Sequence, residues 1–284
     1  MAISSQVPRG PVKAELNYFK DPSDGAKPFN YVETPPEGEP QHNYGKETHE
    51  VTIHDARGRE SDFTLDEDSF AIIRDVPPSA ERDFTSDASI QANYYPELEK
   101  LLLAHVPGST KVVFFDHTIR RADPSAERGP VQRVHVDQTA TSAALRVRRH
   151  LPAGEAERLL AGRYRIVNVW RPLNKAPVES FPLAFASSST LRDEDVVPVE
   201  HRYRSGYTGQ TAAIRHDPGQ KWYYLSGMTG DERLLLQCFD SESLKEGTAV
   251  KGGRVPHTAF VDPRTRPDAE GRESIEVRAL VFGP

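Results

Sequence analysis

YRIVNVWRPL (164–173) and SIEVRALVF (274–282) are the first and last of a series of short apolar runs in the second half of the chain. The runs between them are PVESFPLAFA (177–186), DVVPVEHRY (195–203), QTAAIRH (210–216), KWYYLSGM (221–228), RLLLQCFDS (233–241) and VPHTAFVD (255–262). Turn sequences such as DPG, TGD and GG separate many of them. Short strands punctuated in this way are typical of a sandwich or barrel, so the sequence predicts a mainly β fold.

The first half of the chain predicts further strands and one long helix. Residues 1–45 are rich in proline, glycine and polar residues and predict an irregular N-terminal arm. Alternating apolar and polar residues over 49–56 and 61–76 predict two strands that could pair as a hairpin, and 110–118 reads as a buried strand. Apolar residues at helical spacing predict a helix over 87–106.

The middle of the chain joins these parts into one domain. Residues 131–139 predict a short strand, and the segment 139–161 predicts two helices inserted into the fold. A chain of 284 residues is within the range of a single all-β domain. We therefore expect one domain over 46–284, preceded by the irregular arm.

Composition excludes several classes of protein. The net charge is -6 with both signs interspersed, so no basic stripe exists for nucleic acid or an anionic membrane. Cys238 is the only cysteine, which excludes an internal disulfide and any cluster of thiolate metal ligands. The N-terminus lacks the apolar stretch of a secretory signal. These features predict a cytoplasmic protein, and the long helix and the arm offer surface for a possible homodimer.

A metal site is the chemistry that the histidines suggest. His135 is the only one of ten histidines with a carboxylate two positions later, at Asp137. In a strand these two side chains project from the same face and could chelate one ion. Iron(II) oxygenases use two histidines and one carboxylate, which leaves three coordination positions open. The alternative at this point is a structural or solvated pair at a strand edge.

The second histidine must come from elsewhere in the chain. The downstream candidates are His150, His201, His216 and His257. His257 differs from the others because it lies near the C-terminus at the start of a strand-like run, and a loop then leads into the last strand.

Taken together, these features resemble a known family. The motif HxD, a distant histidine and an Arg-x-Ser pair on the next strand are similar to those of the double-stranded β-helix 2-oxoglutarate dioxygenases. The blocks that carry a closer resemblance are VFFDHTIRR (113–121), VHVDQT (134–139), VNVWRPL (167–173), WYYLSGM (222–228), DERLLLQCFDS (231–241), PHTAFVDP (256–263) and RESIEVRALVF (272–282). They resemble the fungal hydroxylase/desaturase family, which includes gibberellin desaturase-like and cephem methoxylase-related proteins.

The resemblance covers the chain from about residue 50 and implies both fold and activity. The fold would be a jelly-roll, cupin-like double-stranded β-helix with flanking helices. Its metal would be iron(II), held by His135, Asp137 and His257, with 2-oxoglutarate and O2 as cosubstrates. The activity would be hydroxylation or desaturation of a small molecule of secondary metabolism. The alternative is a cupin-like metal oxidase that does not use 2-oxoglutarate.

The last strand supplies two candidates for binding the far carboxylate of 2-oxoglutarate. A guanidinium is a planar, permanently charged partner for a carboxylate. Arg272 and Arg278 differ by six positions and therefore share one face of the strand, together with Ser274. We expect Arg272 with Ser274 to form the anchor, and Arg278 to be the substitute because Glu276 offers it an ion pair.

The run VNVWRPL offers three possible substrate or pocket contacts, Asn168, Trp170 and Arg171. Asn168 and Trp170 alternate along one strand face and Arg171 takes the other. The face that carries Asn168 and Trp170 lines either the pocket or the core. Tyr224 could contribute a hydroxyl group to the site, but aromatic residues in strands mostly pack.

The run FDHTIRR offers a second group of polar contacts. His117 and Arg121, with Asp116 and Arg120, could bind a carboxylate of the substrate through charge-assisted hydrogen bonds. A structural cluster of salt bridges is the alternative.

Overall fold

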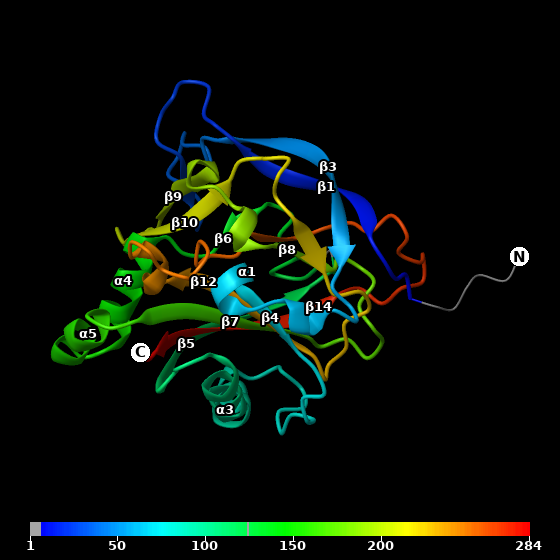
Figure 1. Ribbon diagram of the computed structural model, residues 1–284. Helices are drawn as coiled ribbons and strands as arrows, with labels where there is room; N and C mark the ends of the chain where they lie inside the picture. Colours follow the sequence, from blue (N-terminus) through cyan, green and yellow to red (C-terminus); the bar gives the residue numbers. More distant parts are fainter. Residues whose placement is uncertain (1–6, 124) are drawn as a thin grey trace, which may run out of the picture.

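Two β-sheets packed face to face form the body of this computed structural model, which describes residues 7–123 and 125–284 (Figure 1). The larger sheet has the order β1-β3-β11-β8-β13-β6-β10-β9-β2 and the smaller one β4-β12-β7-β14-β5. The strands of the larger sheet are β1 (Val12–Lys20), β2 (Phe29–Tyr31), β3 (Gly45–Asp55), β6 (His135–Val136), β8 (Leu183–Ala186), β9 (Val196–Arg202), β10 (Thr208–Ile214), β11 (Trp222–Tyr224) and β13 (His257–Ala259). The smaller sheet contains β4 (Phe70–Ile73), β5 (Lys111–Arg121), β7 (Tyr164–Pro172), β12 (Arg233–Asp240) and β14 (Glu273–Phe282).

The chain crosses repeatedly between the two sheets, which makes the fold a jelly roll. It passes from β6 to β7 and back to β8, and later from β11 to β12, β13 and β14, changing sheet at each step. Antiparallel neighbours that are distant in sequence, such as β14 between β5 and β7, follow from this winding. The predicted mainly β fold with a double-stranded β-helix core is confirmed.

A helical layer covers the outer face of the smaller sheet. It consists of α2 (Asp87–Ser89), a π-helical turn η2 (Ile90–Tyr94) and α3 (Tyr95–His105), which confirms the predicted helix (Figure 1). Leu98 and Leu102 are buried in one cluster with Val169 and Val277 of the sheet. The apolar stripe of this helix therefore packs on the sheet, and β14 is buried on both faces.

The N-terminal region is more regular than predicted. The expectation of an irregular arm is wrong for residues 12–20, which form β1, and for residues 29–31, which form β2. In β1 the alternate residues Val12, Ala14, Leu16 and Tyr18 are all buried, and the strand pairs with β3. The sequence prediction overlooked this alternation of apolar and polar residues because prolines and glycines are frequent nearby.

The predicted hairpin of 49–56 with 61–76 is also wrong. Only residues 70–73 of the second segment form a strand, β4, and it lies in the other sheet from β3. The acidic residues before it form α1 (Leu65–Asp68), because the Thr64 side chain accepts a hydrogen bond from the amide of Glu67 and caps the helix. The remaining short helical turns are η1 (Glu60–Asp62), η3 (Ser188–Thr190), η4 (Asp193–Asp195) and η5 (Ser241–Leu244).

The two helices expected within 139–161 are present as α4 (Ala140–His150) and α5 (Ala153–Leu160), side by side at one edge of the molecule (Figure 1). A capping box between Thr139 and Ser142 begins α4 directly after the HxD segment. None of the helices in the described ranges is both long and apolar enough to span a membrane.

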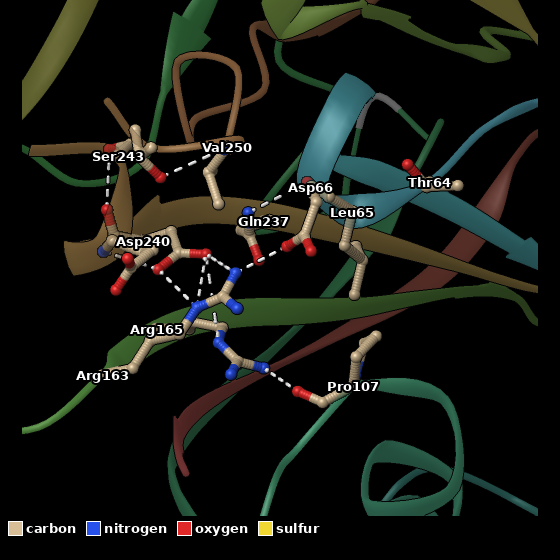
Figure 2. Close-up of polar contacts among 12 residues, drawn as sticks. Thr64, Leu65, Asp66, Pro107, Arg163, Arg165, Gln237, Asp240, Ser243 and Val250 are labelled. Atoms are coloured by element: carbon tan, nitrogen blue, oxygen red, sulfur yellow. Dashed lines mark hydrogen bonds and ion pairs between the residues drawn. The ribbon is translucent and has the colours of Figure 1, made fainter. Parts of the chain in front are cut away.

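A buried ionic cluster fixes the start of β7, at the opposite end of that strand from Trp170 (Figure 2). The guanidinium of Arg163 donates to Asp240 and to Asp66, at 2.6 and 2.5 Å. Arg165 donates to the carbonyl oxygen of Pro107, at 3.0 Å. The cluster therefore joins α1, β7, β12 and the loop after α3.

Candidate metal and cosubstrate site

Three side chains converge between the two sheets at the end of β6. His135 and His257 are directly paired neighbours on β6 and β13, and Asp137 follows β6. One ligand atom from each of the three residues lies within 4.8 Å of the other two. The Oδ1 atom of Asp137 is 3.3 Å from Nε2 of His135 and 3.9 Å from Nε2 of His257. The side chains are 15, 4 and 12% exposed for His135, His257 and Asp137, so the group is largely shielded from water.

Hydrogen bonds orient both histidines for a cation. Nδ1 of His135 lies 2.8 Å from the carbonyl oxygen of Arg133, and Nδ1 of His257 lies 3.2 Å from that of Val255. A carbonyl oxygen only accepts, so each Nδ1 carries a proton, and in the neutral ring Nε2 then has a free lone pair. Burial, followed by the neighbouring His135, lowers the pKa of His257 to about 4, which keeps that ring neutral at pH 7.

The carboxylate of Asp137 is held by two donors from the smaller sheet. Its Oδ2 atom accepts from Nδ2 of Asn168 at 2.8 Å and from Nε of Arg278 at 2.9 Å. Burial alone would raise the pKa of Asp137, but the positive charge of Arg278 holds that pKa well below its usual range. The carboxyl group of Asp137 therefore stays ionised, and its Oδ1 atom faces the two Nε2 atoms. Two imidazole nitrogens and one carboxylate oxygen fit a divalent transition metal such as iron.

A narrow pocket extends from these three residues into the space between the sheets. Its lining residues are Thr118, Arg120, Val131, His135, Asp137, Trp170, Leu183, His257, Thr258, Ala259, Arg272, Ser274, Glu276 and Arg278. The predicted Arg272, Ser274 and Arg278 all lie here. The two sheets thus place the three candidate ligands and the candidate anchor residues around one space.

Arg272 is a buried cation without an anionic partner in the described part of the chain. It is 1% exposed, its Nη1 atom donates to the carbonyl oxygen of Phe181 at 2.7 Å, and its Nε atom has no partner among the described residues. Its guanidinium lies 5.7 Å from the ring centre of Trp170. Burial, and then the charge of Arg120, lower the pKa of Arg272 to about 9. An uncompensated buried charge is costly, so this position favours binding of an anion.

Arg278 differs from Arg272 because its charge is already neutralised. Its guanidinium donates to Asp137 at 2.9 Å, Asp116 at 3.0 Å and Glu276 at 2.5 Å. The predicted ion pair with Glu276 is therefore present. With three carboxylates around it, Arg278 is suited to orienting Asp137 and has little capacity left for a further anion.

The alternation along β7 distributes its polar residues as predicted. Trp170 lines the pocket and Asn168 contacts Asp137, so this face is turned toward the pocket. Arg171 lies on the opposite face, where its guanidinium packs over the rings of Phe84 and Tyr94. The inclusion of Arg171 among the pocket residues is therefore wrong.

The other substrate candidates lie outside the pocket. His117 and Arg121 are on the outer face of β5, where His117 bonds to Tyr95 and Arg121 pairs with Glu273. Tyr224 donates to the carbonyl oxygen of Gly10, and its ring packs against Phe260. None of the three lines the pocket of the metal residues, because alternation sends Thr118 and Arg120 inward instead. His117 and Arg121 line a separate cavity on the outer face of β5.

Two pocket residues were missed or underrated by the sequence reading. Arg120 and Glu276 both line the pocket, directly across from Ser274 and Trp170 respectively. The alternation of side chains along a strand could have identified both residues, because each projects from the same strand face as a residue that was already a candidate.

Comparisons with known proteins agree with this geometry. A family model described as "Oxidoreductase/YMDC permease-like domain" matches residues 16–282. "Hydroxylase/desaturase poxK" of Penicillium oxalicum is 38% identical over 97% of this chain and 92% of its own length. "Fe(II)/2-oxoglutarate-dependent dioxygenase nvfI" of Aspergillus novofumigatus is 35% identical over 93% of this chain and 95% of its own length. The solved structure of the "iron and alpha-ketoglutarate-dependent endoperoxidase NvfI" matches with a TM-score of 0.85 and 30% identity, covering 97% of this chain and 99% of that one.

A jelly roll with two histidines and one carboxylate facing its interior defines the class of non-haem iron oxygenases. Within that class, this chain belongs to the fungal hydroxylase/desaturase family of Fe(II)/2-oxoglutarate-dependent dioxygenases. The predicted family, its iron(II) cofactor and its 2-oxoglutarate and O2 cosubstrates are confirmed. The alternative of a cupin-like oxidase that does not use 2-oxoglutarate is not favoured.

Proposed function

We propose that His135, Asp137 and His257 hold the iron and that Arg272 with Ser274 binds the far carboxylate of 2-oxoglutarate. The enzyme then hydroxylates or desaturates a small molecule of secondary metabolism. The chemistry that such a centre supplies is oxidation of a C–H bond by O2, coupled to conversion of 2-oxoglutarate into succinate and CO2. The observation that carries the proposal is the unpaired, buried Arg272 in the same pocket as the three candidate metal ligands.

The residues around this site have different roles. The carbonyl oxygens of Arg133 and Val255 fix the tautomers of the two histidines, and Asn168 and Arg278 orient Asp137. Such outer contacts commonly tune metal affinity and ligand basicity. Trp170 and Leu183 provide apolar walls that limit access of water to the pocket.

The direct test is turnover of 2-oxoglutarate by the purified protein with iron(II) and ascorbate. We expect slow succinate formation without substrate, and faster formation when a panel of small molecules includes a substrate. Mass spectrometry of that substrate would show a gain of one oxygen atom for hydroxylation, or a loss of two hydrogen atoms for desaturation. Absence of iron-dependent succinate formation with every panel member would contradict the proposal.

Two expectations from the sequence remain proposals about the whole protein. We propose a cytoplasmic location, which the single buried thiol of Cys238 fits. We also propose a homodimer, which light scattering on the purified protein would test.

A further inference from the structure

Arg120 is a second cation of the pocket that has no anionic partner. Its guanidinium donates from Nη1 to the carbonyl oxygen of Gly129 at 3.1 Å, and no carboxylate of the described residues lies within 4.0 Å of it. It lines the same space as the metal residues. Arg121, the next residue, faces the other way and pairs with Glu273 at 3.1 Å. Arg120 therefore lacks a carboxylate that neutralises its charge, whereas Arg121 has one in Glu273.

The sheet register brings Arg120 to the candidate cosubstrate anchor. Arg120 is directly opposite Ser274 in the pairing of β5 with β14, and Arg272 lies two residues before Ser274, directly before the first residue of β14. Directly opposed residues project from the same face, as do residues two apart. The three side chains consequently form one cluster of two guanidinium groups and one hydroxyl.

Two unpaired guanidinium groups side by side repel each other. Burial lowers the pKa of both, and the charge of Arg120 is one of the causes for Arg272. Glu276 is an acidic group of the same pocket, but its carboxylate accepts a hydrogen bond from Arg278 at 2.5 Å. An anion placed between Arg120 and Arg272 would relieve this repulsion and give both groups a charge-assisted partner.

We propose that Arg120 and Arg272 bind one carboxylate together, the far carboxylate of 2-oxoglutarate, with Ser274 as a third donor. This two-arginine anchor rests on the proposed function and adds a second cation to it. A carboxylate has two oxygen atoms with about four acceptor positions, which suffices for two guanidinium groups and a hydroxyl.

The position of Arg120 along its strand favours the cosubstrate over the substrate. Asp116, on the same strand, is at the level of Arg278 and hence of Asp137. Arg120 lies four residues further on, roughly 13 Å along the strand at the usual rise per residue. It is therefore displaced from the level of the metal residues toward Ser274 and Arg272, the candidate cosubstrate anchor.

The test compares two ligands on protein loaded with Mn(II), which occupies the site without turnover. Titration calorimetry would measure the affinity of 2-oxoglutarate and of 2-oxobutyrate, which has the same 2-oxo acid end but no far carboxylate. We expect Arg120→Gln to weaken 2-oxoglutarate binding about tenfold, as for loss of a charged hydrogen bond, with 2-oxobutyrate unaffected. Arg120→Lys should recover part of the loss.

Arg121→Gln is the matched control, since it removes the adjacent guanidinium from the outer face, and its affinities should equal those of the wild type. Unchanged 2-oxoglutarate affinity in Arg120→Gln would overturn the two-arginine anchor and assign Arg120 to another anion, such as an acidic substrate. Equal loss for both ligands would also overturn it, as a general disturbance of the pocket. If the wild type itself shows no Mn(II)-dependent 2-oxoglutarate binding, that result contradicts the proposed function, and with it the two-arginine anchor.

Discussion

Asp137 uses its two carboxylate oxygen atoms for different contacts. Oδ2 accepts from Asn168 and Arg278, and Oδ1 faces the two histidines. A carboxylate held in this way presents one oxygen atom to a metal and cannot easily rotate to present both. The residues that define the site are thus supported by the opposite sheet.

Removing one of these supports should weaken metal binding. We expect Asn168→Ala to lower the affinity for iron(II) by roughly 10- to 100-fold, because outer-sphere contacts of metal ligands commonly have effects of this size. Anaerobic titration with iron(II) would measure it. Arg171→Gln, on the other face of the same strand, is the control and should bind iron normally. Wild-type affinity in Asn168→Ala would show that Arg278 alone orients Asp137.

Arg272, directly before β14, and Arg278, within that strand, should respond differently to substitution. Arg272→Leu removes the unpaired guanidinium and should raise the 2-oxoglutarate requirement at least tenfold, since losing a buried charged partner costs about 2 to 5 kcal/mol. Iron binding should persist. Arg278→Leu should instead impair iron binding through Asp137. Steady-state succinate formation and iron content, measured on both variants, would reveal the reverse pattern if Arg278 were the anchor.

His201 should make stability depend on pH. Burial, and then the charge of Arg133, lower the pKa of His201 to about 4, whereas an unfolded chain titrates at the usual value near 6.5. Below pH 6.5 the unfolded state binds the proton first, so the free energy of unfolding falls as the pH drops from 6.5 toward 4. Denaturant titrations at pH 7 and pH 5 should show a smaller loss for His201→Gln than for the wild type. Equal losses would mean that His201 is not held neutral.

At the scale of elements, β14 links the site to the helical layer. Its inward residues include Ser274, Glu276 and Arg278, and its outward residues Ile275 and Val277 pack in the cluster under α3. Each face of this strand therefore serves a different purpose. Loss of packing under the helix should affect stability more than chemistry.

Leu102→Ala should cost about 2 to 5 kcal/mol of folding stability, the usual range for a buried leucine. Leu102 is fully buried, while the adjacent Leu103 is 40% exposed, so Leu103→Ala is the control and should change stability little. Iron binding by the folded Leu102→Ala protein should remain normal. Chemical denaturation measures the first effect, and a loss of iron affinity in Leu102→Ala would show that the outer layer also shapes the site.

The elements that could be predicted were those with an unbroken period. The helix over 87–106 and the strands from 164 onward follow their apolar patterns closely. β1 and β4 were misjudged because strong local turn composition or a helix cap lay beside a short apolar alternation. On β5, sequence alone could not decide which of the two alternating sets of residues faces inward, because polar residues occupy both faces of this edge strand.

At the scale of the whole molecule, the site depends on parts of the chain that are far apart in sequence. His257 lies 122 positions after His135, yet the two are paired neighbours on adjacent strands. The HxD motif indicated two ligands by spacing, but the third could be chosen only through the resemblance to a family. Closure of the jelly roll is the physical reason that this distant histidine reaches the same space.

The most direct test of this account is the amount of iron bound per chain after anaerobic loading and gel filtration. We expect about one iron per wild-type chain, because a two-histidine, one-carboxylate set holds a single ion. His135→Ala, Asp137→Ala and His257→Ala should each remain folded and retain almost none. His216→Ala, which changes a histidine stacked on His49 away from the site, should bind iron as the wild type does. Normal iron content in His257→Ala, or its loss in His216→Ala alone, would contradict the account.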